Sequence, residues 1–147
     1  MEKNVVLKSF IKYVTLNVMG MIGFSCYILA DTYFISKGMG ADGLTSLNLA
    51  IPVYTFINGT GLMIGIGGGA KYAVLKAKGN NEEADNMFNY SIKSGILTGV
   101  IFFLAGIFLG DGISHMLGTD NVTFNMTSTY LKTIMSFAPL FILNNIF

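Results

Sequence analysis

Four long apolar stretches alternate with short polar connections along the chain. They cover residues 13–36, 47–70, 88–110 and about 122–147. A helix needs about 20 residues to cross the hydrocarbon layer of a bilayer. The first three stretches have that length, and the fourth, which is polar at its start, has it if its first turns lie at the headgroups. Apolar and polar positions do not alternate within them, so helices are predicted rather than the strands of a barrel. The pattern therefore predicts an all-α membrane protein with four transmembrane helices.

The lysines concentrate in every second connection. Three precede the first stretch and three lie between the second and third, whereas the other two connections are poor in lysine: Lys3, Lys8, Lys12; Lys71, Lys76, Lys78. Positively charged connections stay on the cytoplasmic side. We therefore expect a multi-pass protein of the cell inner (plasma) membrane with a cytoplasmic N-terminus.

The composition agrees with a lipid environment. Only 12% of residues are charged and 52% are hydrophobic, whereas about a quarter of a soluble domain is charged. The formal net charge is +1 and arginine is absent, so no nucleic-acid partner is expected. The single cysteine, Cys26, allows neither an internal disulfide nor a thiolate metal cluster.

Glycines recur at four-residue spacing in the second and third stretches. The rows are Gly61, Gly65 and Gly69, then Gly95 and Gly99, and Gly106 and Gly110. Helices in lipid pack by close backbone approach along such rows. The rows therefore predict a bundle of touching helices.

Asp31 is the one acidic residue inside the first stretch. A charge there costs at least about 2.5–3.5 kcal/mol, so such a residue faces a cavity, has a partner or is protonated. Helical spacing places four other residues on its face: Tyr27, Phe24, Gly20 and Asn17. This stripe indicates a proton or cation site; the alternatives are a structural carboxylate bonded to a neighbouring helix, or one that stays wet near the interface.

Polar residues of the second stretch are expected at a membrane depth similar to that of Asp31. Asn48 comes first, and Thr55 follows two turns later beyond Pro52. We therefore expect a polar pocket between the first two helices, with Asn17, Asn48 and Thr55 as lining residues. Tyr27 either donates a hydrogen bond to Asp31 or packs at the interface.

Other motifs do not indicate catalysis. The run at residues 65–70 matches a dinucleotide fingerprint, but it ends a membrane-length helix instead of following a strand. His115 has no cysteine or histidine near it in the sequence that would complete a metal site. We expect neither an enzyme nor a bound metal or cofactor.

Several short motifs occur together in one order along nearly the whole chain. They are Tyr27-Ile-Leu-Ala-Asp31, Leu49-Ala-Ile-Pro52, Gly65-Ile-Gly-Gly-Gly-Ala70, Gly79-Asn-Asn-Glu-Glu-Ala84 and Ala138-Pro139-Leu-Phe. In this combination the chain resembles the MATE (multidrug and toxic compound extrusion) family.

The resemblance implies twelve helices in two lobes around a cavity that opens alternately to each side. It implies export of amphiphilic, often cationic compounds by antiport with protons or sodium, with Asp31 and Tyr27 at coupling positions. The chain departs from many members in lacking a proline early in its first helix. The partners expected are a small amphiphilic substrate, the lipid bilayer and the remaining helices of a full-length transporter, of which this chain would be the N-terminal portion.

Two other functions remain open from the residues. A flippase for lipid-linked sugars has a similar architecture, but its cavity should carry basic residues, and the first two stretches offer none. A small membrane scaffold or assembly protein that transports nothing is the other alternative.

Overall fold

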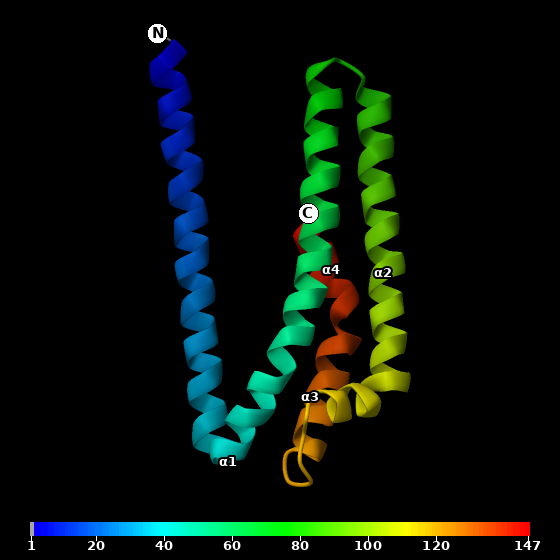
Figure 1. Ribbon diagram of the computed structural model, residues 1–147. Helices are drawn as coiled ribbons and strands as arrows, with labels where there is room; N and C mark the ends of the chain where they lie inside the picture. Colours follow the sequence, from blue (N-terminus) through cyan, green and yellow to red (C-terminus); the bar gives the residue numbers. More distant parts are fainter. Residues whose placement is uncertain (1) are drawn as a thin grey trace. The chain divides into compact units, whose positions relative to one another are not determined.

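The computed structural model describes the backbone of residues 2–147, and all of their side chains except those of residues 2–6 and Phe24. Its helices are α1 (Glu2–Ala77), α2 (Asn81–Met116), α3 (Phe124–Ser136) and α4 (Ala138–Ile146), and the described backbone contains no strand (Figure 1). Both α1 and α2 are long and apolar enough to cross a membrane. The predicted all-α class is confirmed.

The helix α1 contains the first two predicted stretches in one hydrogen-bonded run. Gly40 interrupts its geometry with φ 67° and ψ −150°, a backbone conformation that is essentially restricted to glycine. Just beyond it the chain divides into two compact units, Met1–Leu44 and Thr45–Phe147. Helix α1 therefore belongs to both units.

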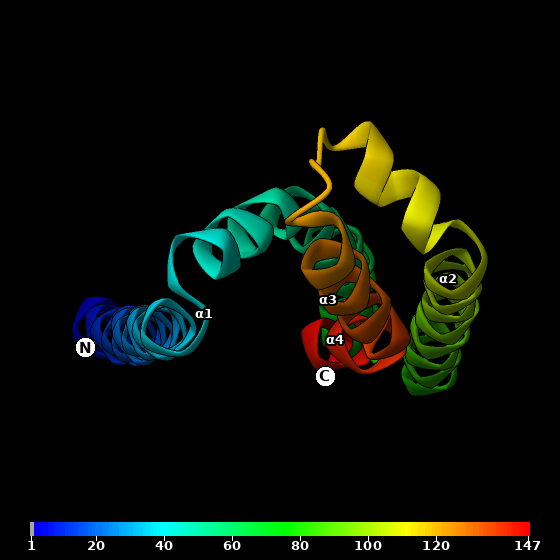
Figure 2. The ribbon, with the colours of Figure 1, turned by 90° about the horizontal axis from the view of Figure 1, so that it is seen from below.

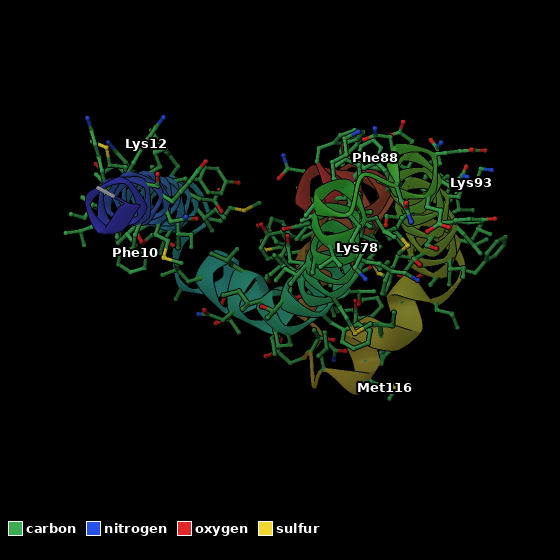
Figure 3. All side chains as sticks on the ribbon, turned by 90° about the horizontal axis from the view of Figure 1, so that it is seen from above. Phe10, Lys12, Lys78, Phe88, Lys93 and Met116 are labelled. Atoms are coloured by element: carbon green, nitrogen blue, oxygen red, sulfur yellow. The ribbon has the colours of Figure 1, made fainter. Side chains whose placement is uncertain are left out.

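The first unit is a single helical arm. Nearly all its described apolar side chains are exposed, as Phe10 (63%), Leu29 (70%) and Phe34 (69%) illustrate. Figure 3 shows side chains leaving this helix on all sides, around the labelled Phe10 and Lys12. The predicted role of Lys3 in orientation lies outside the described side chains.

The second unit packs residues 45–77 of α1 with α2, α3 and α4 (Figures 1 and 2). Its core joins Ile57 of α1 to Met135, Ala138 and Ile142 of α3 and α4. Glycines with positive φ, Gly79 and Gly118, lie in the connections that follow α1 and α2. The buried side chains therefore come from stretches far apart in the sequence.

The stretch expected as one helix over about 122–147 is divided in two. Helix α3 ends at Ser136 and α4 begins at Ala138, with Phe137 between them at φ −92° and ψ 2°. Pro139 lies in the first turn of α4. Proline lacks an N–H and disfavours helical geometry in the residue before it, so its position favours a helix start here.

All members of the predicted glycine rows except Gly69 lie at helix contacts. A Cβ added at Gly99 would lie 2.6 Å from Pro139 Cα, and one at Gly61 would lie 3.1 Å from Ile142 Cα. Gly110 lies beneath the Lys132 side chain, whose Cγ would be 2.9 Å away from such a Cβ. The prediction of touching helices is confirmed for the second unit.

Candidate functional site

Asp31 and Tyr27 lie in the helical arm of the first unit. Asp31 is partly exposed and Tyr27 is 62% exposed. The Asn17 side chain is exposed, and its amide donates to the Tyr13 carbonyl at 2.8 Å. Because the arm is helical without interruption up to Gly40, the three- and four-residue spacing places these residues on one face. Of the predicted stripe, only the Phe24 side chain lies outside the described part.

Asn48 and Thr55 lie in the second unit. Both belong to the 45–77 part of α1, and both are exposed. The predicted pocket would combine them with Asp31 of the first unit. The role of Asp31 and the pocket therefore both stay predictions.

An amide pair joins α1 to α4 inside the second unit. Asn145 Nδ2 donates to Asn58 Oδ1 at 3.2 Å and to the Phe141 carbonyl at 2.9 Å. The Asn58 amide in turn donates to the Tyr54 carbonyl at 3.1 Å. Both asparagines lie in predicted membrane stretches, where amides bond across helices. Neither asparagine was predicted from the sequence to have a role, although an asparagine within an apolar run was a usable signal.

A charged cluster joins α2 to α3. Lys132 Nζ lies 2.8 Å from both carboxylate oxygens of Asp111. The buried Ser128 hydroxyl also donates to Asp111. Lys132 is the one lysine after Lys93, and this isolation was the signal that could have marked it. Asp111 therefore neutralises the charge of Lys132, a lysine that does not belong to either of the two lysine-rich connections.

The connection before α3 contains a hydrogen-bonded carboxylate, that of Asp120. Asp120 Oδ1 accepts hydrogen bonds from the Thr123 hydroxyl at 2.7 Å and from the Thr123 N–H at 3.0 Å. These bonds favour the charged form. The Thr123 hydroxyl and N–H therefore hold the pKa of Asp120 below its ordinary value of 3.8.

The described side chains form no group of three His, Cys, Asp or Glu that could hold a metal ion. Two hydrogen-bonded pairs, Asn58–Asn145 and Asp111–Lys132, instead tie helices together. The described residues therefore supply one carboxylate, Asp31, within the apolar stretch of the first unit, and closely packed helices in the second unit.

The sequence pattern of the MatE family matches residues 18–147. This match covers most of the chain. The chain belongs to the MatE family. Membership agrees with the apolar helices, and the protein is an all-α membrane protein.

Curated relatives of this family member are named as exporters. "Multidrug export protein MepA" of Staphylococcus saprophyticus is 30% identical over 142 residues, which are 97% of this chain. The protein of the same name in Staphylococcus aureus strain MRSA252 is 28% identical over the same length. The chain spans 32% of each relative. No solved structure matches the chain.

Proposed function

We propose that this chain is the N-terminal portion of a secondary active exporter of amphiphilic, cationic compounds. In this proposal the transporter lies in the plasma membrane with a cytoplasmic N-terminus, and export is driven by antiport with protons or sodium. Membership of the MatE family and the multidrug export relatives support the transporter class. The single observation that carries the coupling role is Asp31, the one charged residue within the predicted membrane stretch 13–36.

The chemistry of Asp31 suits ion exchange. A carboxylate that loses water is destabilised in its charged form, and it regains a neutral state by binding a proton or a cation. A transporter that exposes such a group alternately to each side can therefore couple ion entry to substrate exit. In this mechanism Tyr27, one turn before Asp31, donates to the carboxylate when it is charged.

The substrate site would be apolar with few polar groups. Transporter cavities of this kind combine aromatic and aliphatic surface with scattered hydrogen-bonding side chains near the middle of the membrane. Asn17, Asn48 and Thr55 are the lining residues that we propose from this chain. Helices beyond Phe147 would complete the cavity.

Replacement of Asp31 tests the proposal. In the full-length protein, Asp31→Asn should abolish drug efflux driven by a proton or sodium gradient in proteoliposomes, because asparagine cannot carry the exchangeable charge. Asp31→Glu should retain part of the flux. Asp42→Asn, in the same unit but outside the predicted membrane stretch, is the matched control and should transport normally.

Two results would contradict the proposal. Undiminished gradient-driven efflux by Asp31→Asn would remove the coupling role from this residue. Failure of the unaltered full-length protein to move any amphiphilic cation, under either gradient, would favour the flippase or scaffold alternatives.

A further inference from the structure

Lys93 lies in the apolar part of α2, on the side that faces away from the other helices of its unit. It is the one charged residue of the predicted stretch 88–110. Ser91 and Gly95 belong to the buried side of α2, and Lys93 is two positions from each, so it lies on the opposite side. Its side chain is exposed. Figure 3 shows the labelled Lys93 on the side of α2 away from α4 and the 45–77 part of α1.

No described acidic side chain forms an ion pair with Lys93. The ion pairs of the described residues join Lys76 to Asp85 and Lys132 to Asp111. A charged side chain within a membrane stretch is costly unless it finds a partner or reaches the interface. The charge of Lys93 therefore needs an anionic partner that is not one of these side chains.

The position and direction of the side chain bring this partner to the headgroup layer. Lys93 follows Phe88, the first residue of the predicted stretch, by five positions, which corresponds to roughly 7–8 Å of depth. Helical side chains lean toward the N-terminus of their helix, and α2 begins at Asn81, next to a lysine-rich connection. A lysine stem spans such a depth with its charge at the interface. The ammonium group therefore reaches the phosphates of the lipid headgroups.

The neighbours of Lys93 on the same side of α2 are polar toward this connection. Asn89 and Tyr90 precede it by four and three positions, a spacing that brings helical side chains together. Both are exposed, Tyr90 by 66%. The amide and the phenol can each donate a hydrogen bond to a phosphate oxygen. Tyrosine is also enriched at the membrane interface.

On the other side of Lys93 the same face is apolar. Leu97 and Val100 follow it by four and seven positions and are 65% and 42% exposed. The face therefore has a cation and hydrogen-bond donors at the headgroup level and an aliphatic surface toward the middle of the membrane. A phospholipid has the same order of groups, a phosphate followed by acyl chains.

We propose that this face of α2 binds one anionic phospholipid. The Lys93 ammonium pairs with the phosphate, Asn89 and Tyr90 donate hydrogen bonds to it, and an acyl chain lies along Leu97 and Val100. The unpaired positive charge favours an anionic lipid over a zwitterionic one, and the adjoining aliphatic surface favours a lipid over a soluble anion. The site needs neither Asp31 nor transport.

Quenching by brominated lipids tests the occupant directly. The chain contains no tryptophan, so Leu97→Trp places a single fluorophore here once tryptophans elsewhere in the full-length protein are replaced. In phosphatidylcholine vesicles, half-maximal quenching should need about fivefold less dibrominated phosphatidylglycerol than dibrominated phosphatidylcholine. Phe108→Trp, 80% exposed on the same helix but 15 positions beyond Lys93, is the matched control. The two lipids should quench it equally.

Charge substitutions in the Leu97→Trp background identify the residue that selects the lipid. Lys93→Gln should abolish the preference for phosphatidylglycerol, whereas Lys93→Arg should retain it. Tyr90→Phe should weaken it. Lys78→Gln removes an exposed lysine of the connection instead, and it should leave the preference unchanged.

Four results would overturn the proposal. Equal quenching by the two lipids would remove the selectivity, and a preference that survives Lys93→Gln would remove the role of this lysine. Quenching of Leu97→Trp by neither lipid would show that protein covers the face. Loss of the preference in excess inorganic phosphate, at constant ionic strength, would assign Lys93 to a soluble anion.

Discussion

The two units of this chain differ in how much of their apolar side-chain surface is buried. In the first unit, large side chains such as Phe10, Met19 and Leu29 are more than half exposed. In the second unit, residues such as Ile57, Leu131 and Ile142 are fully buried among neighbouring helices. Both units contain long apolar stretches, so hydrophobicity alone does not decide how much of a helix surface is buried within its unit.

Contacts at glycine differ between the two units in the same way. In the first unit, Gly20 and Gly23 have no neighbour within 4 Å of an added Cβ, whereas Gly61, Gly99 and Gly110 lie against another helix. Lipid tails are as apolar as leucine, so close backbone approach stabilises helix pairs where hydrophobicity cannot. The second unit is held together by close packing at glycines and by the hydrogen-bonded pairs Asn58–Asn145 and Asp111–Lys132.

The largest expected effect comes from filling a glycine contact. Gly99→Leu should lower the free energy of unfolding by about 3 kcal/mol or more, because the side chain meets the backbone at Pro139 and the helices must part. Denaturant titration of the full-length protein in detergent measures the loss. Gly112→Leu, on the same helix but with no neighbour within 4 Å, should change stability by less than about 1 kcal/mol.

The division at Gly40 can be tested in the same way. Gly40→Ala should cost about 1–3 kcal/mol, because alanine is strained at φ 67° and ψ −150°. Gly38→Ala lies in regular helix and should instead raise helix stability by up to about 1 kcal/mol. Thermal unfolding of both variants gives the comparison, and equal midpoints would show that Gly40 does not fix the break.

The Asp111–Lys132 pair should contribute less to stability than Gly99 or Gly40. The two side chains are 59% and 40% exposed, so solvent screens the pair and removal of either charge should lower the unfolding midpoint less than either glycine substitution does. A double-mutant cycle with Asp111→Asn and Lys132→Gln measures the coupling. The exchanged pair Asp111→Lys with Lys132→Asp should recover part of it. Strictly additive single effects would show that the contact contributes nothing.

The smallest effect is a pH dependence at the start of α3. The bonds from Thr123 keep the pKa of Asp120 below 3.8, so their stabilisation is complete above that value and is lost as the pH falls through the folded-state pKa. The unfolding midpoint should therefore decrease below about pH 4. Asp120→Asn and Thr123→Val should each reduce this decrease, because both lessen the difference between the folded and unfolded states in proton binding at position 120. An unchanged acid profile in both variants would contradict the assignment.

The sequence predicted features that depend on neighbours along the chain. The apolar stretches, their helical class and the glycine rows follow from residue spacing within a single helix. The break at Phe137 was accessible from Pro139, but membrane helices often contain proline, and we expected one continuous helix. The proposed site at Asp31 rests on the same local spacing and stays a prediction.

Contacts between distant residues were beyond sequence reasoning. Asn58 is 87 positions from Asn145, and Asp111 is 21 positions from Lys132. Each pair forms because helix packing brings two polar faces together at one register. Likewise, Gly65 and Gly69 belong to one row, but only Gly65 contacts α4.

By itself, the sequence determined that this protein is a membrane protein, that its backbone is helical and that one acid lies within its first apolar stretch. Length, hydropathy and helical period are properties of single segments, and a bilayer leaves helices and closed barrels as the only spanning structures. The tertiary structure decided which glycines contact a helix, which polar groups pair and which side of α2 stays exposed. Those outcomes depend on the register and the angle between helices, which no single segment encodes.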